Sequence, residues 1–304
     1  MTEFNFSIII ASVGRQSLLS VLKCLNDSTR LPKEVIICLP QQDKYEIDIN
    51  SLNSTNSKFE IKIIKSHEKS QTIQRLQAFK NISCEFLMQM DDDLFFEKNF
   101  LEKMILKYNI LLKQYSGSNI CLAPLYRFLK NKKPVHTYGF KFRNNTIKLI
   151  YNLYFKIFHK LPFGNKKLGK VSCNSIPFGV YFSSEKIDFV KTEWLAGGCI
   201  LMNSDSFTNY NHHPLMGKAY TEDIISSFLR IKEKKAKHFV SLNTDIFIED
   251  YDKFADIEVN FFKDTIREFK SRLLYVKITK GNYLYFFFWY FLYIFMKVYK
   301  YVRK

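Results

Sequence analysis

The sequence predicts an α/β fold built on a mostly parallel sheet with helices on its faces. Short apolar segments rich in β-branched residues alternate with amphipathic segments along the first third of the chain. Apolar runs without polar alternation are typical of strands that are buried on both faces, as parallel strands are. Two of these runs lead directly into polar residues, which indicates where a ligand could bind.

Strands are expected at residues 6–11 (FSIIIA), 34–39 (EVIICL), 59–65 (FEIKIIK) and 84–90 (CEFLMQM). A leucine pattern from Leu18 to Leu25 predicts a helix after the first strand, and a second helix is expected at residues 71–79. Ligands of such sheets bind beyond the carboxyl ends of the strands. We therefore expect the residues that follow the first and fourth strands to share one crevice.

A chain of 304 residues can bury a sizeable core. We predict a main domain at residues 1–265, with a basic, aromatic insertion at about 139–170, and a membrane-associating helical segment at 266–304. Lys and Arg number 46 against 29 Asp and Glu, a net charge of +17 that predicts attraction to nucleic acid, anionic lipid or phosphorylated molecules. The six cysteines form no CxxC pair, which favours a reducing compartment over a disulfide framework.

Three adjacent carboxylates, Asp91, Asp92 and Asp93, follow the fourth predicted strand. Like charges repel and burial adds a desolvation cost, so a cation is expected beside them. Mg²⁺ and Mn²⁺ prefer oxygen ligands, commonly one or two carboxylates completed by water and phosphate. In an extended segment Asp91 and Asp93 would project to the same side. A solvated acidic turn is the alternative, and the strand-end position favours the metal site.

A second acidic pair, Glu222 and Asp223, opens an amphipathic helical segment. Acids in the first turn of a helix are favoured by its exposed N–H groups, so capping is one interpretation. The other interpretation is that one of the two carboxylates accepts a proton from an attacking hydroxyl group.

Five segments, in their order along the chain, resemble those of family 2 glycosyltransferases of the GT-A fold. They are FSIIIASVGR, SQTIQRLQAF, MQMDDDL, WLAGGCILM and TED, and the resemblance covers roughly residues 6–240. The resemblance implies an inverting transfer of a sugar from a nucleotide-sugar to a hydroxyl group. It implies that Asp91 and Asp93 bind Mg²⁺ or Mn²⁺, and that Asp223 is the catalytic base with Glu222 beside it. By the same resemblance, the donor-side residues are Ala11, Ser12, Arg15, Asp43, Arg75 and Asp92, and the acceptor-side residues are Trp194, Gly197 and Gly198.

Two departures from that family narrow the expectation. Many relatives carry an acidic pair after the second strand, whereas CLPQQD leaves only Asp43, or the amides Gln41 and Gln42, to contact the base of the nucleotide. The resemblance therefore implies UDP as the nucleotide of the donor only because UDP is the commonest nucleotide in that family. The QxxRW signature of processive synthases is absent, which favours the addition of one sugar per encounter.

The chain ends in GNYLYFFFWYFLYIFMKVYKYVRK, where residues 283–296 carry no charge. A helix that crosses a bilayer needs ~20 apolar residues. On a helix, Tyr290, Tyr293, Lys297 and Lys300 would form one polar stripe, with the phenylalanines elsewhere. This pattern predicts a helix lying on an anionic membrane, as a peripheral protein at the cytoplasmic face of the inner or plasma membrane. A single membrane span is the less favoured alternative.

The leading functional hypothesis is an enzyme that extends a glycan or lipid-linked acceptor in the synthesis of cell-surface polysaccharide or lipooligosaccharide. One alternative is a metal-dependent nucleotidyltransferase, although SVGRQ holds a single glycine where a triphosphate loop would be rich in glycine. The other is a non-catalytic basic protein that binds a membrane or nucleic acid. Because the positive charge gathers near the aromatic terminus, lipid is favoured over nucleic acid.

Overall fold

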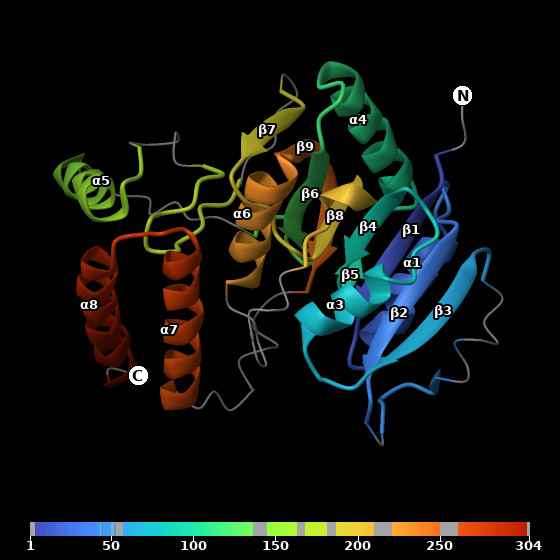
Figure 1. The fold of residues 1–304 in the computed structure, drawn as a ribbon, viewed down its shortest axis with the longest axis horizontal. Helices are drawn as coiled ribbons and strands as arrows, with labels where there is room; N and C mark the ends of the chain where they lie inside the picture. The colour runs from blue at the N-terminus through green and yellow to red at the C-terminus, as the bar shows by residue number, and fades with distance from the viewer. Residues whose placement is uncertain are drawn as a thin grey trace.

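The computed structural model describes residues 4–42, 44–49, 52, 57–135, 145–162, 168–180, 187–209, 221–249 and 261–302. The strands are β1 (Phe6–Ala11), β2 (Glu34–Pro40), β3 (Glu60–Ser66), β4 (Phe86–Met90), β5 (Leu94–Phe95), β6 (Ile120–Phe128), β7 (Phe189–Thr192), β8 (Cys199–Asn203) and β9 (Lys237–Ile248). The helices are α1 (Ser17–Asn26), α3 (Gln71–Phe79), α4 (Phe100–Gln114), α5 (Asn145–His159), α6 (Glu222–Lys234), α7 (Phe261–Ile278) and α8 (Tyr283–Val302). Figure 1 shows the sheet with helices against it, and α7, α8 and α5 at one end of the molecule.

The strands form one sheet in the order β3-β2-β1-β4-β8-β6-β9-β5, with β7 on β9. Strands β1 to β4 are parallel, as the sequence predicts. The other half is mixed, because β8 runs antiparallel to both β4 and β6. Met90, at the end of β4, therefore lies beside Cys199, at the start of β8. This antiparallel pairing brings the glycines before β8 against the acids after β4.

Both faces of β1, β2 and β4 are buried, which explains their continuous apolar sequences, whereas the edge strand β3 is partly exposed. Ile8 and Ile10 of β1 pack with α1 and α4 on one face. Ile9, between them, packs with Ala78 of α3 on the other face. The side chains alternate because successive residues of a strand point to opposite faces.

Helices α5, α7 and α8 extend the molecule away from the sheet (Figure 1). Helix α7 packs on α6, where Tyr275 joins a cluster with Ile225 and Leu229. Helix α8 packs on α7 through Phe286, Trp289 and other buried side chains. Helix α7 begins at Phe261, so the predicted domain boundary after residue 265 falls inside this helix.

The face that α8 turns inward differs from the predicted one. Tyr290 and Tyr293 were expected on a polar stripe with the lysines, but Tyr290 is buried and its hydroxyl donates to the Thr265 carbonyl (3.0 Å). The Tyr293 hydroxyl donates to Glu268 Oε1 (3.1 Å). A tyrosine can bury its ring when its hydroxyl finds an acceptor, so both residues serve helix packing. No helix in the described part of the chain combines the length and hydropathy needed to cross a bilayer.

Candidate active site

Arg75 joins the two acidic segments. This side chain extends from α3 and is almost fully buried. Its Nη2 lies 2.6 Å from Asp91 Oδ1, and its Nη1 lies 2.6 Å from Glu222 Oε1. The end of β4 and the start of α6 therefore meet at one guanidinium group, although they are distant in sequence. Arginine suits this place because its planar fork can bind two carboxylates at once.

Two consecutive glycines bring backbone into close contact with this acidic cluster. A Cβ atom at Gly197 would lie 2.2 Å from Asp223 Oδ1, and one at Gly198 would lie 2.9 Å from Asp91 Oδ2. The backbone N–H of Gly197 donates to the Asp223 carboxylate. The Asp91 N–H donates to the Gly198 carbonyl (2.7 Å). Only glycine leaves room for both carboxylates at this distance.

The three adjacent aspartates have different surroundings, because they form a turn after β4 rather than an extended segment. Asp91 faces Arg75 and accepts a hydrogen bond from Gln71 Nε2 (3.0 Å). Asp92 is buried and accepts from the Ser12 hydroxyl (2.5 Å). Arg15 Nη1 lies 3.9 Å from carboxylate oxygens of both Asp92 and Asp93. The exposed fraction of the side chain is 29% for Asp91, 7% for Asp92 and 37% for Asp93.

Burial raises the pKa of four of these carboxyl groups. For Asp93 burial acts first and repulsion from Asp91 and Asp92 adds to it, raising the pKa to about 6. Burial also raises the pKa of Asp92, against the effects of Arg15 and Ser12.

Burial raises the pKa of Glu222 to about 7, although Arg75 opposes the shift. The pKa of Asp223 is raised by burial too, while Arg75 and the Gly197 N–H oppose the rise. The cluster is thus short of positive charge.

Buried amide side chains hold the loops around the cluster. Gln74 Nε2 donates to the carbonyls of Ser12 (2.7 Å) and Cys38 (2.6 Å), which ties the ends of β1 and β2 to α3. Gln89 Nε2 donates to the Gly197 carbonyl (2.5 Å). Neither Gln74 nor Gln89 was predicted from the sequence as a site residue. A polar residue inside the apolar run FLMQM was the signal for Gln89, because a buried amide needs a hydrogen-bond partner.

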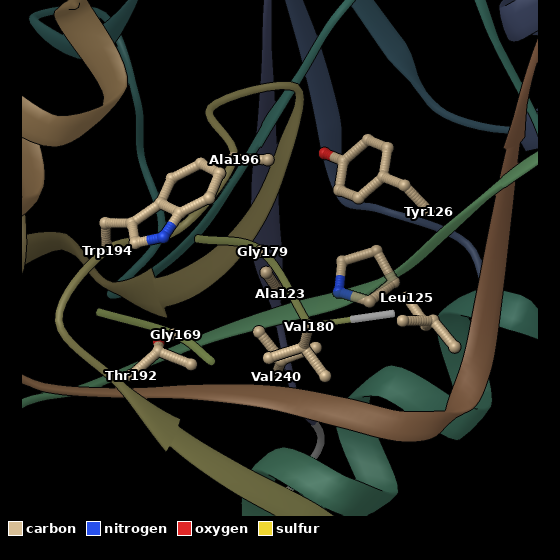
Figure 2. A pocket seen from close by; sticks show the side chains of 11 residues that line it. Ala123, Leu125, Tyr126, Gly169, Gly179, Val180, Thr192, Trp194, Ala196 and Val240 are labelled. Atoms are coloured by element: carbon tan, nitrogen blue, oxygen red, sulfur yellow. The ribbon is translucent and has the colours of Figure 1, made fainter. Parts of the chain in front are cut away.

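A mostly apolar pocket lies next to the two glycines, with an empty volume of about 330 Å³ that includes solvent at its mouth. Figure 2 shows Trp194 and Tyr126 on opposite sides of it, with Val180 and Val240 nearby. The Trp194 indole N–H donates to the Phe178 carbonyl (3.1 Å), which fixes the ring. The Tyr126 hydroxyl lies 3.0 Å from the position of a Cβ at Gly198. The pocket therefore adjoins the acidic cluster.

The structure brings most of the predicted site residues together. Ser12, Arg15 and the three aspartates meet beyond β1 and β4, and Arg75 connects them to Glu222. Ala11 is the buried last residue of β1, beside Cys38. Asp43 lies outside the described residues. Among those residues, no three His, Cys, Asp or Glu side chains converge as a closed metal site.

The donor set nevertheless fits Mg²⁺ or Mn²⁺. These ions are commonly bound by one or two carboxylates, with the other positions filled by water and substrate phosphate. Asp93 offers the most exposed carboxylate of the triplet, and after burial the charges of Asp91 and Asp92, which a cation would offset, contribute to its raised pKa. Asp91 adds oxygens on the same turn, although one of them already pairs with Arg75.

The fold and this site define a glycosyltransferase of the GT-A class. Residues 7–170, more than half of the chain, match the family model "Glycosyl transferase family 2". The chain therefore belongs to glycosyl transferase family 2. The sequence has no significant match among curated proteins.

Solved structures of glycosyltransferases are similar to this chain at low sequence identity, one of them with a TM-score above 0.5. The crystal structure of GalNAc-T7 with UDP, GalNAc and Mn²⁺ matches with a TM-score of 0.55 at 11% identity, covering 81% of this chain and 43% of that one. S. aureus TarS 1–349 matches with a TM-score of 0.45 at 12% identity, covering 88% of this chain and 70% of that one. The structure of TarS 1–349 in complex with UDP-GlcNAc matches with a TM-score of 0.49 at 12% identity, covering 81% of this chain and 58% of that one. The chain thus spans less than half the length of the GalNAc-T7 chain.

Proposed function

We propose that this glycosyltransferase moves one sugar, with inversion, from a nucleotide-sugar to a hydroxyl group of a glycan or lipid-linked acceptor. The observation that carries the proposal is the convergence of Asp91 and Glu222 on Arg75, 2.6 Å from each. This contact joins a strand-end acidic turn, suited to a metal and diphosphate, to a carboxylate pair suited to proton transfer. Membership of family 2 favours sugar transfer over the nucleotidyltransferase and non-catalytic alternatives.

Asp223 is proposed as the catalytic base. It is half-buried, whereas Glu222 is buried and occupied by Arg75, so Asp223 has the better access to an acceptor. In the proposed step Asp223 accepts the proton of the acceptor hydroxyl, whose oxygen forms a bond to the anomeric carbon. The bond from that carbon to the diphosphate breaks, and its electron pair leaves with the nucleotide. Glu222 and the Gly197 N–H keep Arg75 and Asp223 in position.

On the donor side, we propose that Ser12, Arg15, Arg75, Asp92 and the end of β1 at Ala11 surround the nucleotide-sugar, with Asp43 near its base. Asp91 and Asp93 would hold Mg²⁺ or Mn²⁺, which when bound neutralises charge on the departing diphosphate. The GalNAc-T7 structure contains UDP and Mn²⁺, which supports a UDP-sugar as the donor. Trp194, Gly197 and Gly198 are proposed on the acceptor side, beside the pocket of Figure 2.

We further propose that residues 1–265 perform the transfer, with residues 139–170 as an insertion, and that residues 266–304 hold the enzyme on a membrane. The location would be peripheral, at the cytoplasmic face of the inner or plasma membrane, in the synthesis of cell-surface polysaccharide or lipooligosaccharide. The surplus of basic residues supports an anionic membrane as the partner.

Isothermal titration of UDP, with and without Mn²⁺, tests the donor site. We expect UDP to bind the wild-type protein with Mn²⁺, and binding to weaken at least about tenfold when Mn²⁺ is left out or Asp93 is replaced (Asp93→Ala). Asp205→Ala, at an exposed acid away from the cluster, is the matched control. Binding that needs no metal and survives Asp93→Ala would overturn the metal assignment. A panel of nucleotide-sugars, assayed for UDP release, then identifies the donor.

A further inference from the structure

Helices α5 and α8 are far apart in sequence, but the end of α5 packs against the first half of α8. The rings of Phe158 and Phe288 stack with their centroids 5.7 Å apart, and His159 meets Trp289 at 5.6 Å. Lys160 Nζ lies 5.6 Å from the centre of the Tyr285 ring. In Figure 1 both helices lie at the end of the molecule opposite β3.

Both helices are held by their inner faces. Phe286, Trp289 and Tyr290 of α8 are buried against α7, and Tyr154 of α5 joins the same cluster. Cys173 N–H donates to the His159 carbonyl (3.3 Å) at the end of α5. The rotation of each helix about its own axis is therefore set by packing and hydrogen bonds.

Large apolar side chains cover the outer sides of these two helices. Phe291 is 72% exposed, Phe295 67% and Leu284 81%. We define the α5–α8 surface by its exposed apolar residues: Leu149, Leu153 and Ile157 of α5, and Leu284, Phe287, Phe288, Phe291 and Phe295 of α8. Single exposed apolar residues are ordinary on a soluble protein, but a group of this size on adjacent helices marks an interaction surface.

The charge around this surface identifies the partner. Residues 145–162 and 277–302 contain no Asp or Glu, and they carry seven lysines: Lys148, Lys156, Lys160, Lys277, Lys280, Lys297 and Lys300. An apolar face on two segments whose charged residues are all basic complements a bilayer with anionic headgroups, at about 1 kcal/mol for each basic residue near the lipid. A second copy of the chain would bring the same positive charge to the contact, which opposes self-association.

We propose that α5 and α8 together form a lipid-insertion surface, which enters the boundary between headgroups and acyl chains of an anionic bilayer. The proposal adds a helix from the middle of the chain to the C-terminal contact, and it names the inserted side chains. If the acceptor is lipid-linked, as the proposed function allows, the same surface also affects how the acceptor reaches the pocket. Residues 168–180 connect the surface to the pocket: Phe178 meets Phe155 of α5 (5.4 Å), and Gly169, Gly179 and Val180 line the pocket. A lipid-linked acceptor would reach the pocket from the same membrane.

Co-sedimentation with vesicles tests the proposal, using the full chain. The vesicles contain phosphatidylcholine alone, or equal parts of phosphatidylcholine and phosphatidylglycerol. We expect the wild-type protein to bind the anionic vesicles at least about tenfold more strongly, and added salt to weaken this binding. Two double variants, Phe291→Ser with Phe295→Ser in α8 and Leu153→Ser with Ile157→Ser in α5, should each lower the partition coefficient at least about tenfold.

The matched control is Leu106→Ser with Ile110→Ser, at exposed apolar positions of α4. It should bind vesicles as the wild-type protein does. Circular dichroism and UDP release from a donor should be unchanged in all variants, which separates loss of membrane binding from loss of fold or of sugar transfer. Full vesicle binding by the α5 variant would overturn the two-helix surface. A dimer in light scattering that Phe291→Ser with Phe295→Ser dissociates would also overturn it, and would assign the surface to a second copy.

Discussion

Glu34 and Glu222 are both buried carboxylates, but the protein surrounds them differently. Glu34, at the start of β2, accepts hydrogen bonds from Ser7 Oγ (2.5 Å), Lys62 Nζ (2.5 Å) and the Ser83 N–H (2.6 Å). Glu222 accepts from Arg75, and its Oε2 finds no hydrogen-bond partner among the described residues. Burial alone would raise both pKa values. The three donors outweigh burial at Glu34 and lower its pKa to about 2, whereas the pKa of Glu222 rises to about 7.

The difference separates a structural carboxylate from a functional one. At Glu34 the fold replaces the hydrogen bonds that water would make, so the charge stabilises the sheet. At the acidic cluster one buried guanidinium, that of Arg75, pairs with two carboxylates, Asp91 and Glu222. Carboxyl groups with shifted pKa values and too few hydrogen-bond donors or cations around them are typical of sites that bind a ligand or a metal. Four substitutions test this comparison, in order of expected effect.

Asp223→Asn removes the proposed base and keeps the shape of the side chain. We expect kcat for transfer from the identified donor to fall about 10³-fold or more, because general-base catalysis contributes about 10²–10⁴-fold. The thermal midpoint should not fall. UDP release measures the activity, and Asp205→Asn, at an exposed acid, is the control. Activity within about tenfold of wild type would remove Asp223 from the base role.

Arg75→Gln removes the positive charge shared by Asp91 and Glu222. We expect the free energy of unfolding to fall by about 3–5 kcal/mol near pH 8, since two carboxylates lose their buried partner. The loss should be smaller near pH 5, where a carboxyl with a raised pKa, such as Glu222, is protonated and needs no partner. Urea unfolding at the two pH values measures it. Arg15→Gln, at a partly exposed pair, should cost less than about 1 kcal/mol.

Glu34→Gln removes the well-paired carboxylate. A shift of the pKa from 4.5 to about 2 corresponds to a stabilisation of about 3 kcal/mol, so the variant should be less stable than wild type by about that much near pH 7. Because the folded pKa is lowered, this stability is present above pH 4.5 and is lost as the pH falls towards 2. Urea unfolding against pH measures the loss. Glu60→Gln, at the exposed neighbour of the same Lys62, should cost less than about 1 kcal/mol.

Glu222→Gln should change the stability in the opposite direction to Glu34→Gln, and by no more than that substitution does. Because the folded pKa of Glu222 is raised from 4.5 to about 7, the wild-type protein loses stability as the pH rises through this range. Converted in the same way as for Glu34, this shift corresponds to about 3 kcal/mol, so we expect the variant to be more stable than wild type by up to about 3 kcal/mol above pH 7, and the two to converge below pH 4.5. Thermal midpoints against pH measure the difference. A variant that is less stable above pH 7 would mean that Glu222 is a structural carboxylate like Glu34.

Local pattern was sufficient for the elements of the parallel half. The predicted helix at residues 71–79 matches the bounds of α3, and the predicted strand at 59–65 differs from β3 by one residue at each end. The antiparallel insertion of β8 was not predicted, because its partners β4 and β6 are distant in sequence. Without that pairing the position of Gly198 beside Asp91 could not be predicted either.

By itself, the sequence determined which chemistry lies at the strand ends, because an apolar run followed by three acids is a local pattern. It also determined that the C-terminal helix is aromatic and basic. Only the tertiary structure decided that Arg75 joins Asp91 to Glu222, that α5 lies beside α8, and that Tyr290 and Tyr293 turn inward while Phe291 and Phe295 turn outward. The reason is that desolvation and pairing depend on contacts between distant segments. Periodicity identifies the faces of a helix, but the neighbouring elements decide which face is buried.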